Sequence, residues 1–417
     1  MYPRAPRPVL DSTRFGRTPA SFLLGLAACC LIAIIALAAV VVQRGPAPAL
    51  VGLLLALLPV PLLVALILCL DRLEPEPRAL LAAIFGAGAG IAALTALFGR
   101  VLHTGVITAP ELRPHVSVTA VVPAGQAIDG AFVAETLSGL VLLALLASRR
   151  TEIDGVEDGV VYGSMLGLGY ALVANVYAYA LAWNAGAGAI AEEFASRGIF
   201  APVFQALFAS LIGLGVAYAA ARPAARGRWP AIVAGWGAAV ALDALWNHAA
   251  GADGPWLAAS YLILVAMLIA AVIAVIAGRR RLIRMIRGVL PDFADPEVVT
   301  GQDIRMLASP RLRRLGRQWA RLNHGVAGQR AMAQYQLAAT ELAMACRRLH
   351  LGQTTQDAYV RHRDDSLSLM RAAAALLRER EQLQPPPWTA PDAPSVFVAG
   401  EPGPFWPAGP SWPSGPR

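Results

Sequence analysis

The sequence predicts an all-α membrane protein, a bundle of about eight transmembrane helices followed by a small helical region and a disordered Pro/Gly-rich tail. Of the 417 residues, 57% are hydrophobic and only 15% are charged, and the mean hydropathy is +0.54. This composition is too apolar for a water-soluble protein. Apolar windows long enough to cross about 30 Å of hydrocarbon recur along the chain. Most of the chain is therefore expected to lie in lipid.

The first 277 residues contain eight such windows. The first window follows an Arg-rich start, but it is too long for a signal peptide and lacks a clear small-x-small cleavage site, so we expect it to anchor the chain. The eight predicted spans lie at residues 21–43, 49–70, 79–101, 126–148, 156–182, 199–222, 229–249 and 255–277.

Arginines cluster beside these spans, and the chain contains no lysine. If the amino terminus is cytosolic, the outer loops hold only Arg44, Arg100, Arg113 and Arg197, while the inner side holds the remaining clusters, including that from Arg279 to Arg287. The positive-inside rule then predicts a multi-pass protein of the cell membrane with both termini in the cytoplasm. Membrane lipids are the expected partners of these arginines. Nucleic acid is not expected, because no nucleic-acid-binding motif accompanies them.

The composition changes along the chain and predicts four parts. They are a cytosolic N-terminal segment at 1–20, a transmembrane domain at 21–278, a cytosolic helical region at 279–383 and a disordered tail at 384–417. Within the third part, helical periodicity with many charges at 334–348 and 366–378 predicts a helical hairpin. The four cysteines show no CxxC spacing, so disulfides and zinc–thiolate sites are not expected.

Four polar side chains fall inside predicted spans of the fourth to seventh helices: Glu135, Asn175, Gln205 and Asp243. A charged side chain in hydrocarbon costs about 2.5–3.5 kcal/mol, so each requires an explanation. Counting 1.5 Å per residue from the helix ends predicts that all four lie within roughly one turn of the same depth, in the outer half of the bilayer. They form either a network that joins the helices or a functional site, and the residue types favour neither interpretation.

Three further features have structural interpretations. Asp129 is expected near the outer boundary, where its side chain can reach water, so it is left outside the site. His248 follows Asp243 by five residues and is expected at the membrane surface beside Trp246. Glycines spaced four apart along the fifth span predict a close approach by another helix. These are Gly155, Gly159, Gly163 and Gly167.

A series of short segments occurs in order within the spans and in the loops between them. It consists of DRLEPEPR at 71–78, EIDG at 152–155, DG at 158–159, YG at 162–163, GLGY at 167–170, a Pro-to-Gly stretch at 202–213, and LDALWN at 242–247. This series resembles the PrsW family of intramembrane metalloproteases, especially its longer actinobacterial-type members. The resemblance covers about residues 20 to 280.

The resemblance implies a zinc site built from an EExxK-type motif, an EN motif and histidines on two later helices. Several of these positions are substituted in this chain. Glu135 matches only the second glutamate of the paired motif, and Ser138 stands in place of its lysine. Asn175 lacks the preceding glutamate, Gln205 occupies the position of the first histidine, and Asp243 that of the second. Without imidazoles, zinc is a poor match for this set.

The sequence leads to two main functional hypotheses. The favoured one is a catalytically degenerate PrsW-like protein that needs no cofactor and acts as a membrane binding or regulatory protein for membrane-protein clients. The alternative is an active intramembrane endopeptidase with Glu135 as general base and Asp243 as a second carboxylate or metal ligand, with zinc bound if the site is active. In that case His248 is a candidate for the missing ligand. A transporter or channel is a third hypothesis, but the sequence shows neither inverted repeats nor discontinuous helices.

Overall fold

The computed structural model describes residues 20–70, 76–108, 118–148, 153, 156–220, 228–249, 255–295, 297–350, 352 and 354–378. These residues are almost entirely helical, and the pairing between Asp295 and Val299 is the only β-type contact among them. Eight segments are long and apolar enough to cross a membrane, which confirms the predicted polytopic all-α fold. The predicted N-terminal segment and tail lie outside the described residues and stay predictions.

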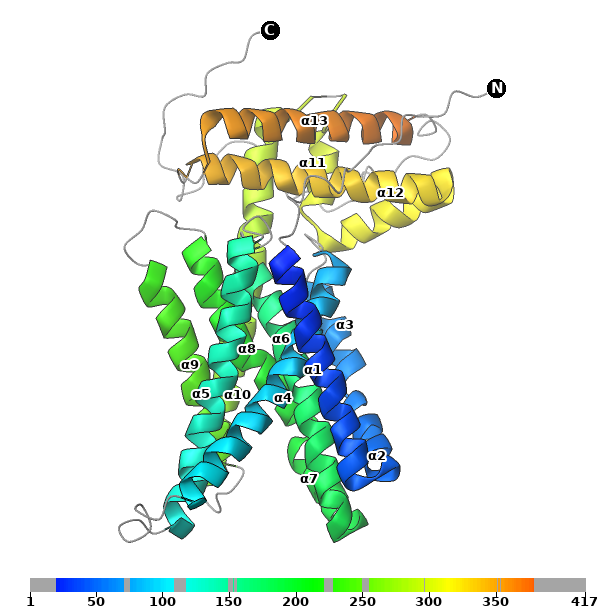
Figure 1. The fold of residues 1–417 in the computed structure, drawn as a ribbon. Coiled ribbons are helices and arrows are strands. Elements are labelled where there is room, and N and C mark those ends of the chain that lie inside the picture. The colour runs from blue at the N-terminus through cyan, green and yellow to red at the C-terminus, as the bar shows by residue number, and fades with distance from the viewer. Residues whose placement is uncertain are drawn as a thin grey trace.

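The spans alternate in direction through the bundle (Figure 1). In chain order they are α1 (Ala20–Arg44), α2 (Pro46–Leu57) with α3 (Val60–Leu70), α4 (Arg78–Thr108), α5 (Val118–Ser148), α6 (Val156–Ala182), α7 (Ala187–Arg197) with α8 (Phe200–Ala220), α9 (Arg228–Ala249) and α10 (Pro255–Val289).

Three of these spans differ from the single straight helices that were expected, and one of them, the sixth, is divided into α7 and α8. The second span is broken between α2 and α3, because Pro59 and Pro61 cannot donate backbone hydrogen bonds to the preceding turn. The last span continues past the predicted end at residue 277 and reaches Val289. Its final turns carry arginines and leave the apolar part of the bundle, so they connect the membrane domain to the helices that follow.

Helix α6 lies at the centre of the bundle and packs closely on α8 and α4. A Cβ atom on Gly159 would lie 2.3 Å from the carbonyl oxygen of Gly213, and one on Gly163 would lie 2.4 Å from that of Ala209. On another face of α6, a Cβ atom on Gly169 would lie 1.8 Å from the carbonyl oxygen of Phe85 in α4. The predicted close approach is therefore confirmed for the described part of the glycine series.

An extramembrane layer covers one end of the bundle, the end at which α1 begins and α10 finishes (Figure 1). It consists of the last turns of α10 with α11 (Gly301–Leu307), α12 (Pro310–His350) and α13 (Gln356–Arg378). Helix α12 folds back on itself at Gly325, whose φ of 64° suits glycine. Its second part packs along α13, and these two helices contain the segments 334–348 and 366–378 that were expected to form a hairpin.

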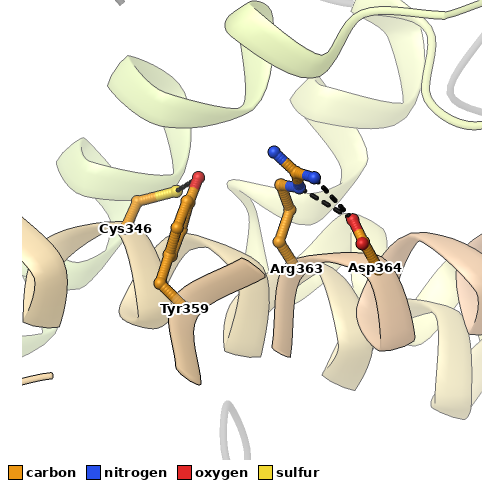
Figure 2. A network of polar contacts seen from close by, with 4 residues as sticks. All are labelled: Cys346, Tyr359, Arg363 and Asp364. Atoms are coloured by element: carbon orange, nitrogen blue, oxygen red, sulfur yellow. Dashed lines mark hydrogen bonds and ion pairs between the residues drawn. The ribbon is translucent and has the colours of Figure 1, made fainter. Parts of the chain in front are cut away.

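Helices α12 and α13 share a buried contact between a thiol and a phenol. The Sγ atom of Cys346 lies 3.4 Å from the hydroxyl of Tyr359, and Figure 2 shows this contact beside the ion pair of Arg363 and Asp364. Burial raises the pKa of the Cys346 thiol, and the hydrogen bond with Tyr359 opposes this only in part. Cys346 therefore acts as a small packing residue in this layer.

Substituting Gly163 with Ala should destabilise the bundle by about 1–3 kcal/mol, because the new methyl group would overlap the backbone of α8. Gly237→Ala is the matched control, since an added Cβ on this α9 residue meets nothing within 4 Å. Thermal unfolding of both variants in detergent measures the difference. Equal midpoints would contradict the close packing of α6 on α8.

Cys346 should react with iodoacetamide more slowly in the folded protein than in the unfolded chain, because its raised pKa leaves less thiolate at neutral pH. The rate should increase only as the pH rises above the usual range for a cysteine. Mass spectrometry of the peptide that contains Cys346 measures this rate separately from the other cysteines. Equally fast labelling of folded and unfolded protein at pH 7 would show that the thiol is accessible.

Candidate functional site

Helices α8 and α9 bring two of the predicted site residues together. The two helices approach closely at Gly215, where a Cβ atom would lie 2.5 Å from the carbonyl oxygen of Ala231. Farther along the pair, the Nε2 atom of Gln205 donates a hydrogen bond of 3.1 Å to Oδ1 of Asp243. Asp243 is only 1% exposed and Gln205 is 7% exposed. The carboxyl group therefore has a protein partner where lipid offers none.

A second amide, which the sequence analysis did not select, binds the same carboxyl oxygen. The Nδ2 atom of Asn247 donates a hydrogen bond of 3.3 Å to Oδ1 of Asp243. Asn247 follows Asp243 by four residues, so both side chains lie on one face of α9. The LDALWN segment shows this spacing, so the contact between Asp243 and Asn247 could have been predicted from the sequence. Asp243 thus accepts from one amide of its own helix and one of α8.

Glu135 reaches the same region from α5. The indole N–H of Trp236 in α9 donates to the hydroxyl of Thr136 at 3.2 Å, and the ring of Trp236 meets that of Phe132 edge to face. These contacts hold α5 against α9 on either side of Glu135. The Glu135 side chain is 2% exposed and interacts electrostatically with Asp243. Its Oε2 atom has no hydrogen-bond partner among the described residues.

Within the described residues, Asn175 forms no hydrogen bond with the other three predicted site residues. Gly167 of α6 faces the backbone of Gln205, and Asn175 follows Gly167 by eight residues, about 12 Å along the helix axis. The equal depth of the four side chains in the bilayer stays a prediction. Helix α6 extends past the start of α8, and its last turns pack on α7 through the rings of Tyr179 and Phe194. Asn175 is buried, and its Nδ2 atom has no partner in the described structure.

Three further polar side chains lie on α5, α6 and α9. Tyr170 of α6 interacts electrostatically with both Glu135 and Asp243 and was not selected from the sequence. Asp129 and His248 are both exposed, and their position near the membrane surface stays a prediction. We use the name intramembrane polar site for Glu135, Gln205, Asp243 and Asn247.

A separate contact joins two of the short sequence segments at the other end of the bundle. The hydroxyl of Tyr162, from the YG segment, donates a hydrogen bond of 2.6 Å to Oε2 of Glu76, from the DRLEPEPR segment. Tyr162 is fully buried and Glu76 is 9% exposed. This bond connects α6 to the start of α4. The two segments therefore stabilise the bundle at a distance from the intramembrane polar site.

The intramembrane polar site does not fit a zinc ion. A catalytic zinc site uses three protein ligands, most often imidazoles with a carboxylate or thiolates. This site contains two carboxyl groups and two amides, and both amide NH₂ groups point at Asp243. No group of three or more His, Cys, Asp or Glu residues suited to a metal occurs in the described part of the chain. His248 is exposed at the end of α9 and does not add a ligand.

The bond between Gln205 and Asp243 can be tested with a double-mutant cycle. Gln205→Leu and Asp243→Ala should each destabilise the protein by about 1–3 kcal/mol, because each leaves a buried polar group short of a partner. The double variant should lose less than the sum of the two, since it removes both partners. Unfolding of the four proteins in detergent gives the coupling free energy. Strict additivity would show that the two side chains do not interact.

Comparison with known proteins agrees with this architecture. A family model described as the PrsW family intramembrane metalloprotease matches residues 76–276, which run from the start of α4 into α10 and include the whole intramembrane polar site. Searches of the curated proteins and of the solved structures gave no match. Through this membrane-spanning part, the chain belongs to the PrsW family of intramembrane metalloproteases.

Proposed function

We propose that this PrsW-family membrane protein has lost metal-dependent proteolysis and acts as a membrane binding or regulatory protein. The observation that carries the proposal is the hydrogen bonding of Asp243, whose Oδ1 atom accepts from Gln205 and Asn247. Asp243 and Gln205 occupy the positions at which the family resemblance implies histidines. A pair of metal ligands is thus replaced by a carboxyl group held by amides.

The hydrogen bonds of this site do not support metal binding, and they also oppose it. A cation at Oδ1 of Asp243 would face two amide groups whose N–H donors carry partial positive charge. Binding would require both bonds to Gln205 and Asn247 to break, and bonds to charged groups contribute about 1.5–3 kcal/mol each. A hard cation would gain only oxygen ligands in return. The arrangement therefore suits hydrogen bonding between helices better than metal hydrolysis.

A polar group from a client helix is the kind of ligand that this site can bind. The Oε2 atom of Glu135 has no hydrogen-bond partner among the described residues although the side chain is buried. A buried polar group without a partner costs free energy, and a polar side chain of another transmembrane helix would remove that cost. We therefore infer that membrane proteins with polar transmembrane segments are the clients.

The purified full-length protein should contain much less than one zinc ion per chain when measured by elemental analysis. The Glu135→Ala, Asp243→Ala double variant serves as the control and should give the same low value. Stoichiometric zinc in the wild type that disappears in the double variant would contradict the proposal. Such a result would also require further ligands in addition to Glu135 and Asp243.

A second candidate function is proteolysis by the two carboxyl groups without histidine ligands. The observation in its favour is again the unpartnered Oε2 atom of Glu135, together with its electrostatic interaction with Asp243. A carboxylate there could remove a proton from water while the second carboxyl group donates one to the leaving amine. The hydrogen bonds that hold Asp243 disfavour this role, because they orient it toward Gln205 and Asn247.

Proteolysis is tested with the isosteric variant Glu135→Gln. We expect membranes with the wild-type protein and membranes with Glu135→Gln to give the same pattern of cleaved membrane proteins when new amino termini are labelled and identified. A membrane protein cleaved only in the wild type would support the second candidate and contradict the first. Client binding is measured in the same membranes by crosslinking, so loss of activity and loss of binding are distinguished.

A further inference from the structure

The first arm of α12, residues 310–325, is the part of the extramembrane layer that lies nearest the transmembrane helices (Figure 1). The arginines that begin at Arg279 mark the end of the apolar part of α10. Leu282 follows within about 5 Å along the axis, and it already belongs to the core of the layer. Leu312 and Trp319 from the first arm belong to the same cluster. The arm therefore lies close to the membrane boundary.

The charge on this part of the layer has one sign. Residues 304–340 contain seven arginines and neither Asp nor Glu. The opposite side of the layer differs, because α13 carries acidic and basic residues together, among them Asp357, Asp364 and Arg363. A uniformly basic segment next to a bilayer complements the negative surface potential of anionic lipids. The mixed charges of α13 do not.

Three of the five arginines of the first arm lie on the face that points away from the protein core, whereas Arg313 is buried and Arg317 bonds to Gln336. Arg311, Arg314 and Arg321 are exposed, and with Leu322 they occupy an arc of about 100° around the helix. The opposite face, which includes Ala320, packs into the layer. No ion pair joins these three arginines to any other described residue. Their guanidinium groups are free to bind phosphate.

Large apolar side chains are exposed where α12 folds back. Leu322 is 85% exposed and Val326 is 56% exposed, one on each side of Gly325. These side chains belong to no described core cluster. Basic and apolar side chains on one face are typical of segments that lie in a membrane interface, with apolar groups among the acyl chains and arginines at the headgroups.

We propose that the first arm of α12 binds the anionic phospholipid headgroups of the adjacent leaflet. Arg311, Arg314 and Arg321 bind the phosphates, while Leu322 and Val326 enter the interface. The layer is thereby attached to the bilayer at a second place in addition to α10. This proposal rests on the charge and exposure of the arm and does not depend on the function proposed for the intramembrane polar site.

Hydrogen–deuterium exchange of the full chain in nanodiscs tests the proposal. Amides of residues 311–326 should exchange more slowly in nanodiscs that contain phosphatidylglycerol than in nanodiscs of phosphatidylcholine alone, by roughly fivefold for each arginine engaged. The difference should disappear at high salt. Equal exchange in the two lipids would overturn the proposal, and this comparison requires no variant.

Matched variants identify the residues responsible. Arg314→Gln with Arg321→Gln should remove most of the lipid-dependent protection, and the corresponding lysine variants should retain most of it. The control is Arg361→Gln with Arg371→Gln, which removes the same charge from exposed positions on α13. An equal loss in the control would overturn the proposal. Two further results would also overturn the proposal. In the first, inorganic phosphate in detergent slows exchange as much as phosphatidylglycerol does. In the second, soluble polyglutamate does so in neutral nanodiscs.

Discussion

The close backbone contact of α6 with α8 and α4 is the constraint on which the rest of this structure depends. A side chain at Gly159, Gly163 or Gly169 would overlap a carbonyl oxygen of a neighbouring helix. Association of helices in lipid gains nothing from hydrophobic transfer, so it relies on such packing and on hydrogen bonds. Because α6 is held between α8 and α4, both helices have a defined register. The position of Gln205 against α9 follows from that register.

The intramembrane polar site shows how the same fold can carry different chemistry. The chain belongs to a family of metalloproteases, and the three helices that build the site, α5, α8 and α9, are present. The side chains they present, however, form hydrogen bonds between Asp243 and two amides rather than a set of metal ligands. Function depends on the site and not on the scaffold. The substitutions therefore carry more weight for function than the fold.

The extramembrane layer has a core of its own and is attached through α10. The end of α10 supplies Leu282 and Ile286 to a cluster with α11, α12 and α13. A helix that begins in the membrane domain and ends in this core joins the two parts without a linker. The basic first arm of α12 then lies on the side that faces the bilayer. Its charge, its exposure and its place in the fold agree with one another.

The number of spans and the polar residues within them could be predicted from the sequence, because the cost of placing polar groups in hydrocarbon leaves a clear pattern. The sequence also indicated the glycine contacts of α6, since small residues four apart lie on one face. Which polar residues bond to one another became clear from helix packing alone. Gln205 and Asn247 donate to Asp243, whereas Asn175 forms no hydrogen bond with them among the described residues. Counting residues from helix ends gives a depth only if all helices end at one level, and helix packing sets those levels.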